Sequence, residues 1–163
     1  MEFEAPMDGW YTWVAVALVS IGLAGVVVSL PDKPPPDADR AAGVLDRVGA
    51  SEYEAAATLD HDAEAVRIGT ERIAMRNSGG TDRARVSFGA VVPVYTLDLT
   101  ADQRTTLDGV LAGERTLPAS LADTLEERLS ALETATGEWR PATGTLRARA
   151  VAVGDRRVVL VAV

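Results

Sequence analysis

Residues 145–163 read TLRARAVAVGDRRVVLVAV, and their pattern predicts a β-hairpin with one apolar face. Polar and apolar residues alternate on both sides of Gly154-Asp155, a dipeptide that favours a two-residue hairpin turn. The register of that hairpin places six small apolar side chains on one face: Ala148, Ala150, Ala152, Val159, Val161 and Val163. Because a helix can lie on such a smooth patch, we expect an antiparallel sheet with helices packed on one face.

A second hairpin is expected around NSGG at residues 77–80. Apolar residues alternate with polar ones before and after this turn sequence. With Ser78-Gly79 as the turn, one register keeps the apolar side continuous, and it pairs Met75 with Asp82 and Ile73 with Ala84. Further on, Pro93 should end a strand or place that strand at a sheet edge.

Three amphipathic helices are expected between and before these strands. The first begins at Asp37 or Asp39 and is closed by Gly49. The second opens with a capping box at Thr100 and stops at Gly113. A third follows Pro118 and carries four leucines at helical spacing: Leu121, Leu125, Leu129 and Leu132. Together with the strands they predict an α+β fold.

The N-terminal part contains a long apolar run, WYTWVAVALVSIGLAGVVVSL, from Trp10 to Leu30. It has no charged residue and would extend about 31 Å as a helix, which matches the hydrocarbon core of a bilayer. We therefore predict a transmembrane helix that acts as an uncleaved signal anchor in the lipid bilayer. The expected organisation is an N-terminal tail (1–9), a transmembrane helix (10–30), a proline-rich linker (31–37) and a soluble α+β domain (38–163).

Small residues form a candidate helix-packing seam on this helix. They share one helical face, where they would let two helix backbones approach closely, and they are Ala15, Gly22, Gly25 and Ser29. The seam predicts contact with other membrane subunits. Three cations, Lys33, Arg40 and Arg47, follow the run and none precedes it, which by the positive-inside rule favours a domain on the inner side.

The composition argues against a nucleic-acid partner and suggests a protein that works at high salt. The net charge is −8, and binding to nucleic acid needs clustered cations, so no nucleic-acid partner is expected. Lys33 is the one lysine among many acidic residues, a bias typical of proteins from extremely halophilic archaea. The chain has no cysteine, which excludes disulfides and thiolate metal sites.

Candidates for chemistry are few. His61 is the one histidine, in LDHDAE, and Asp60, Asp62 and Glu64 could join it around a cation, although a solvated acidic loop explains the same residues. We find no nucleophile elbow, P-loop or dinucleotide fingerprint. The sequence therefore predicts a protein that is not an enzyme and has no catalytic residue, cofactor, metal or small-molecule substrate.

Two arginine pairs are spaced so that each lies on one side of its strand: Arg83 with Arg85, and Arg147 with Arg149. One interpretation is that they bind an acidic partner. The other is that they form the solvated side of a half-buried sheet and meet neighbouring carboxylates.

Several segments carry a resemblance that runs over nearly the whole chain. They are MEFEAP, DGWYTW, the apolar run, PPPDA, VRIGTERIAM, FGAVVPV and EWRPATG. In these the chain resembles an uncharacterised family of small haloarchaeal membrane proteins, similar to pilin-like proteins that accompany archaeal type IV pilus or secretion machinery. Unlike a standard prepilin, the chain has Asp8-Gly9 before Trp10, and Val14 stands where a glutamate is usual.

Two functional hypotheses follow from this resemblance and from the charges. The first is a membrane-anchored, non-catalytic envelope protein, a pilin-like or accessory subunit of an archaeal pilus or secretion-type assembly, with its domain outside the cell. The alternative is a membrane-tethered binding or regulatory module that faces the cytoplasm.

Overall fold

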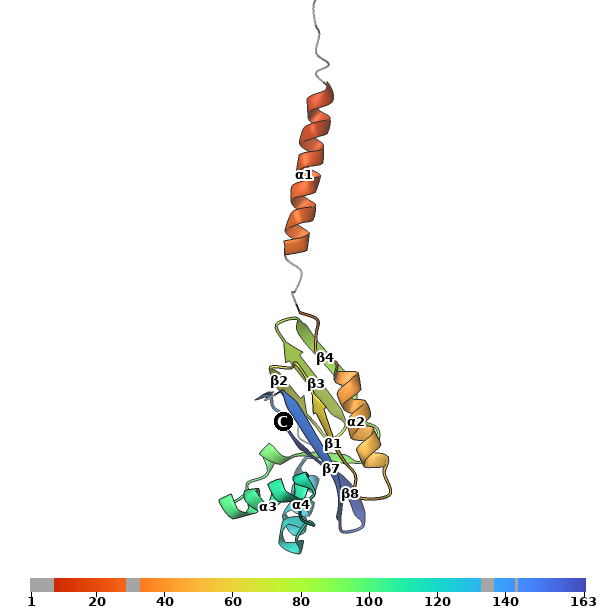
Figure 1. The fold of residues 1–163 in the computed structure, drawn as a ribbon, viewed down its shortest axis with the longest axis vertical. Helices are drawn as coiled ribbons and strands as arrows, with labels where there is room; N and C mark the ends of the chain where they lie inside the picture. Colours follow the sequence, from red (N-terminus) through yellow and green to blue (C-terminus); the bar gives the residue numbers. More distant parts are fainter. Residues whose placement is uncertain (1–7, 29–32, 133–136, 143) are drawn as a thin grey trace, which may run out of the picture. The chain divides into compact units, whose positions relative to one another are not determined.

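The computed structural model describes residues 8–28, 33–132, 137–142 and 144–163, and it divides the chain into two compact units, Met1–Asp32 and Lys33–Val163. Figure 1 shows the elements of both units. The first unit contains helix α1 (Asp8–Val28). Within the described residues, the second contains α2 (Ala38–Ala50), α3 (Ala101–Ala112), α4 (Ala119–Leu132), a 3-10 turn η1 (Val94–Thr96) and eight strands.

Two four-stranded sheets form the second unit. The first, sheet A, has the order β1-β7-β8-β5 and contains β1 (Ala56–Asp60), β5 (Ala90–Pro93), β7 (Thr145–Val153) and β8 (Arg156–Ala162). The second, sheet B, has the order β4-β3-β2-β6 and contains β2 (Ala65–Ile68), β3 (Arg72–Asn77), β4 (Gly80–Arg85) and β6 (Arg140–Pro141). All pairings are antiparallel except that of β5 with β8.

The predicted hairpin registers are confirmed. Residues 154 and 155 form the turn between β7 and β8, with Ala150 opposite Val159. In the earlier hairpin Met75 pairs with Asp82 and Ile73 with Ala84. Local turn chemistry and alternation determine these registers, because a slip of one residue would turn every buried side chain to the opposite face.

Most predicted helix ends are confirmed as well. The Asp37 side chain accepts from Arg40 N–H at the start of α2, and Thr100 and Gln103 form the capping box of α3. Gly113 ends α3 with a positive φ of 82°. Helix α2 continues past Gly49 to Ala50, so Gly49 does not end it. The side chain of Leu132 lies outside the described part of the structure.

Sheet A is buried on both faces, which corrects the expectation of helices on one face. Its first face joins α2 and the inner face of sheet B in one core, with Leu45, Met75, Ala150 and Val159 among its members. Its second face packs α3 and α4 through Val151, Val153, Val158 and Leu160. Figure 1 shows α2 on one side of β7 and β8, and α3 and α4 on the other.

The predicted transmembrane helix is also corrected. Among the residues that the structure describes, no helix is both long enough and apolar enough to cross a membrane. The same finding contradicts the prediction of a single-pass signal anchor. Residues 29 and 30 of the predicted span lie outside the described ranges.

The proline segment after Lys33 packs against the β3–β4 turn. The buried Asn77 side chain donates through Nδ2 to the carbonyl of Pro34 and to Asp62 Oδ2, both at 3.0 Å, and its Oδ1 accepts from Gly79 N–H at 2.8 Å. A Cβ atom on Gly79 would overlap the carbonyl oxygen of Lys33. The absence of a side chain at Gly79 therefore permits this contact.

We predict that Gly79→Ala lowers the free energy of unfolding by about 1–3 kcal/mol, because the added methyl group must displace backbone. Chemical denaturation of the full chain measures it. The matched control is Gly43→Ala in α2, where a Cβ meets nothing within 4 Å and where alanine favours the helix by about 0.5–1 kcal/mol. A Gly79→Ala chain as stable as the wild type would show that the proline segment does not pack on the turn.

Candidate interaction surface

The outer face of sheet B carries five arginines. In β3 the side chains alternate, so Ile73 and Met75 enter the core while Arg72, Ala74 and Arg76 point away from it. The cross-strand register gives the same outward direction to residues of β2 and β4. The arginines of this outer face are Arg67, Arg72, Arg76, Arg83 and Arg85.

Four of these arginines surround one small residue. Ala74 is opposite Arg67 on one side and Arg83 on the other, while Arg72 and Arg76 are two positions before and after it on its own strand. Strand spacings place Arg67 and Arg83 about 10 Å apart and Arg72 and Arg76 about 13 Å apart at the backbone. Ala74 is only 4% exposed although it lies outside both cores. We call Arg67, Arg72, Arg76 and Arg83 the arginine cluster.

Trp139 contacts two members of the arginine cluster. The Cζ atoms of Arg67 and Arg76 lie 5.2 and 4.5 Å from the centre of its ring, within the range of cation–π attraction. Trp139 comes just before β6, and β6 pairs with β2 at the edge of sheet B. An aromatic ring that contacts two guanidinium groups restricts their rotamers, so part of the cluster is held in place before any partner binds.

Among the described residues, no ion pair joins a carboxylate to a member of the arginine cluster. Arg85 has an exposed ion pair with Glu71 at 3.9 Å, of a kind that contributes little stability. Asp82 is directed to the core side, where it accepts from Ala38 N–H at the start of α2. Arg72 lies directly opposite Arg85. Like charges in that position destabilise a sheet by about a few tenths of a kcal/mol.

The second predicted arginine pair has a different environment. Arg149, whose side chain is 13% exposed, forms an ion pair with Glu54 at 2.8 Å, and its guanidinium lies beside Gly113 at the end of α3. A cation there meets the carbonyl end of a helix and joins α3 to the segment before β1. For Arg149 the structure therefore supports the interpretation that it meets a neighbouring carboxylate.

The predicted helix-packing residues lie on the exposed helix α1. Ala15, Gly22 and Gly25 are exposed, and a Cβ on either glycine would meet nothing within 4 Å. Ser29, the fourth predicted member, lies outside the described residues.

His61 lies in a turn between β1 and β2. Its Nδ1 accepts from Ala63 N–H at 3.2 Å, and its backbone N–H donates to the carbonyl of Gly144 at 2.8 Å. Its Nε2 is buried and has no partner among the described residues. A cavity of about 370 Å³ beside it is lined also by Asp37, Arg40 and Asp60. Within the described ranges, no three His, Asp or Glu side chains converge to hold a metal ion.

Sequence reasoning found Arg83 and Arg85 but missed Arg67, Arg72, Arg76 and Trp139. A signal was available for Arg72 and Arg76, because the predicted register pairs Arg72 with Arg85 and Ala74 with Arg83, and alternation puts Arg76 on the same side. Nothing local placed Arg67 or Trp139 beside them. Their positions depend on the pairing of β2 with β3 and with β6.

Comparison with known proteins gives one match. Residues 4–151 match a family of unknown function (DUF7283). The chain belongs to this family. Membership of an uncharacterised family, expected from the resemblance, is thereby confirmed. The match includes α1 and the whole arginine cluster with Trp139. No curated protein and no solved structure matches the chain significantly.

The His61 environment predicts a pH effect on stability. Burial lowers the pKa of His61 and outweighs the opposing charges of Asp62 and Asp60. Below a pH of about 6.5 the unfolded chain therefore takes up a proton that the folded chain resists, and the free energy of unfolding should fall as the pH is lowered.

His61→Asn should flatten this dependence, because an asparagine oxygen can still accept from Ala63 N–H but does not titrate. Unfolding curves of both chains between pH 8 and about 5 measure the difference. Parallel slopes for the two chains would contradict the assignment.

Proposed function

We propose that this chain is a non-catalytic, pilin-like or accessory subunit of a pilus- or secretion-type assembly, in which helix α1 packs against helices of neighbouring subunits. The observation that supports the proposal most strongly is the exposure of α1. Its large apolar side chains are exposed around the helix, with Trp13 at 76%, Ile21 at 69% and Leu18 at 65%.

An isolated helix that is apolar on all sides is unfavourable in water, and such helices are normally buried. Each square ångström of apolar surface of α1 that is removed from water contributes about 25 cal/mol of favourable free energy. Packing several copies of α1 side by side would remove much of this surface. An assembly built on such contacts is the arrangement that a pilin-like subunit requires.

The small residues of α1 suggest where the closest contact forms. Gly22 and Gly25 lie on one face with Ala15 and Leu18, and the space beside both glycines is open. A second helix could therefore approach the backbone at this face more closely than elsewhere. Large residues, including Val19 and Leu23, lie at other positions around the helix.

The resemblance described above supports the finer part of the proposal. It implies a haloarchaeal source and an association with pilus or secretion machinery, and the acidic composition agrees with a protein that works at high salt. The location of the second unit outside the cell stays a prediction.

The test is to block the seam with Gly22→Leu and Gly25→Leu in the full chain. Since the open space leaves the fold of α1 intact, the two leucines should act only by keeping helices apart. We expect association between copies to weaken about tenfold or more, as judged by sedimentation.

The matched control is Ala17→Leu with Ala24→Leu, two small residues on the opposite face of α1. These changes should leave association near the wild-type level. Equal association of the seam and control variants would contradict the proposal. That result would favour the alternative, a binding or regulatory module that acts without assembling.

A further inference from the structure

We propose that the arginine cluster of one copy binds an acidic surface on α4 of a second copy. This acidic surface consists of Asp123, Glu126, Glu127 and Asp155, all of which are exposed. The inference rests on the proposed function only in that both bring copies of the chain together. It concerns a different contact, which lies entirely within the second unit.

The arginine cluster is a basic surface on an acidic protein. The chain has a net charge of −8, yet the segment from Ala65 to Arg85 has five arginines and only two acidic residues, Glu71 and Asp82. The surface that best complements such a cluster is acidic and present at the same concentration. A second copy supplies it, because the rest of the second unit has an excess of carboxylates.

The acidic surface is compact and faces away from the core. Leu121, Leu125 and Leu129 are buried, which directs Asp123, Glu126 and Glu127 outward on the remaining face of α4. The β7–β8 turn brings Asp155 near them, since the Glu126 carboxylate lies 3.8 Å from the Cβ position of Gly154. Three carboxylates of α4 are thus grouped on one face, and Asp155 lies in the adjoining turn beside the exposed Arg156 and Arg157.

The composition of the cluster favours a protein partner. Arginine and tryptophan are enriched at protein interfaces, and Trp139 keeps two of the guanidinium groups in place without neutralising them. The four arginines lie on an open sheet face of about 10 by 13 Å, which is the scale of a helix surface. Each guanidinium can also bind a carboxylate through two parallel hydrogen bonds.

The contact would be heterologous, because the two surfaces on each copy are different. A copy that offers its arginine cluster to one neighbour still has its acidic surface available for another. Such contacts propagate into a ring or a filament. This behaviour is what an assembly subunit needs from its folded unit.

The test is a charge exchange in the full chain. One variant carries Arg72→Glu and Arg83→Glu, and the other carries Glu126→Arg and Glu127→Arg. Both are made with Gly22→Leu and Gly25→Leu, so that α1 contributes no association. Each variant alone should associate about tenfold or more weakly than the seam-blocked parent, and a mixture of the two should recover the parental association. Raising the salt concentration should weaken the recovered complex.

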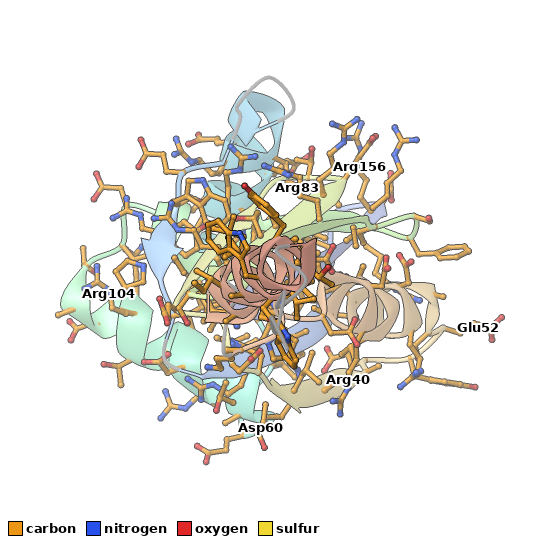
Figure 2. All side chains as sticks on the ribbon, turned by 90° about the horizontal axis from the view of Figure 1, so that it is seen from above. Arg40, Glu52, Asp60, Arg83, Arg104 and Arg156 are labelled. Carbon is orange, nitrogen blue, oxygen red and sulfur yellow. The ribbon has the colours of Figure 1, made fainter. Side chains whose placement is uncertain are left out.

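The matched control is Arg40→Glu with Arg104→Glu, which changes the charge equally. Arg40 lies on α2 and Arg104 on α3, outside sheet B, and Figure 2 labels both apart from Arg83. The control should associate like the parent. If the variant with Arg72→Glu and Arg83→Glu fails to fold, as judged by its unfolding curve, Arg83→Glu alone replaces it in the measurement of the single variant and in the mixture.

Two results would overturn the inference. One is a mixture that associates no more tightly than its components, and the other is a control that weakens association as much as the cluster variant. Failure of the α1 proposal leaves the test intact. In that case the seam-blocked parent simply associates like the wild type, and the charge exchange still reports on the arginine cluster.

Discussion

The β7–β8 hairpin is buried on both faces, and the other layers of the second unit pack on one face or the other. Ala148 and Ala150 lie with Val159 and Val161 on the first face, which the small side chains keep low enough for α2 and sheet B to approach. Val151 and Val153 lie with Val158 and Leu160 on the second face, beneath α3 and α4. A polar residue at any of these positions would be buried without a hydrogen-bond partner.

This double burial explains why the arginines gather where they do. Sheet B uses its inner face to complete the first core, so the arginines of its strands point outward. Three short strands then bring arginines from three segments of the chain around Ala74. The cost of placing like charges together is small compared with the burial on the inner face, and the fold can therefore carry the cluster without a compensating carboxylate at each arginine.

Local signals predicted much of this fold. The two hairpin registers, the capping box at Thr100 and the end of α3 at Gly113 depend on residues within a few positions of each other. Long-range pairing was not predictable in the same way. No local pattern indicates that β5 pairs in parallel with β8, or that β1 pairs with β7. The run VVLVA at 158–162 does signal burial on both faces, and an alternating interpretation of it led to helices on one face only.

The candidate surfaces also divide into parts that local signals predict and parts that depend on long-range strand pairing. The predicted seam on α1 needed only helical periodicity, and Arg83 and Arg85 needed only strand alternation. The complete arginine cluster needed the pairing of β2 with β3, and Trp139 needed that of β6 with β2. The cluster is thus a product of topology, which is why Arg83 and Arg85 alone left both interpretations open, an acidic partner and the solvated side of a half-buried sheet.

Trp139 offers the most direct test that the second unit associates through this face. In a chain with Trp10→Phe and Trp13→Phe it is the one remaining tryptophan, and both changes lie off the α1 seam. Its quenching by acrylamide should be followed as the protein concentration rises. The account predicts that quenching falls over the concentration range in which copies associate, because the cluster beside Trp139 becomes covered. Unchanged quenching while sedimentation shows association would contradict it.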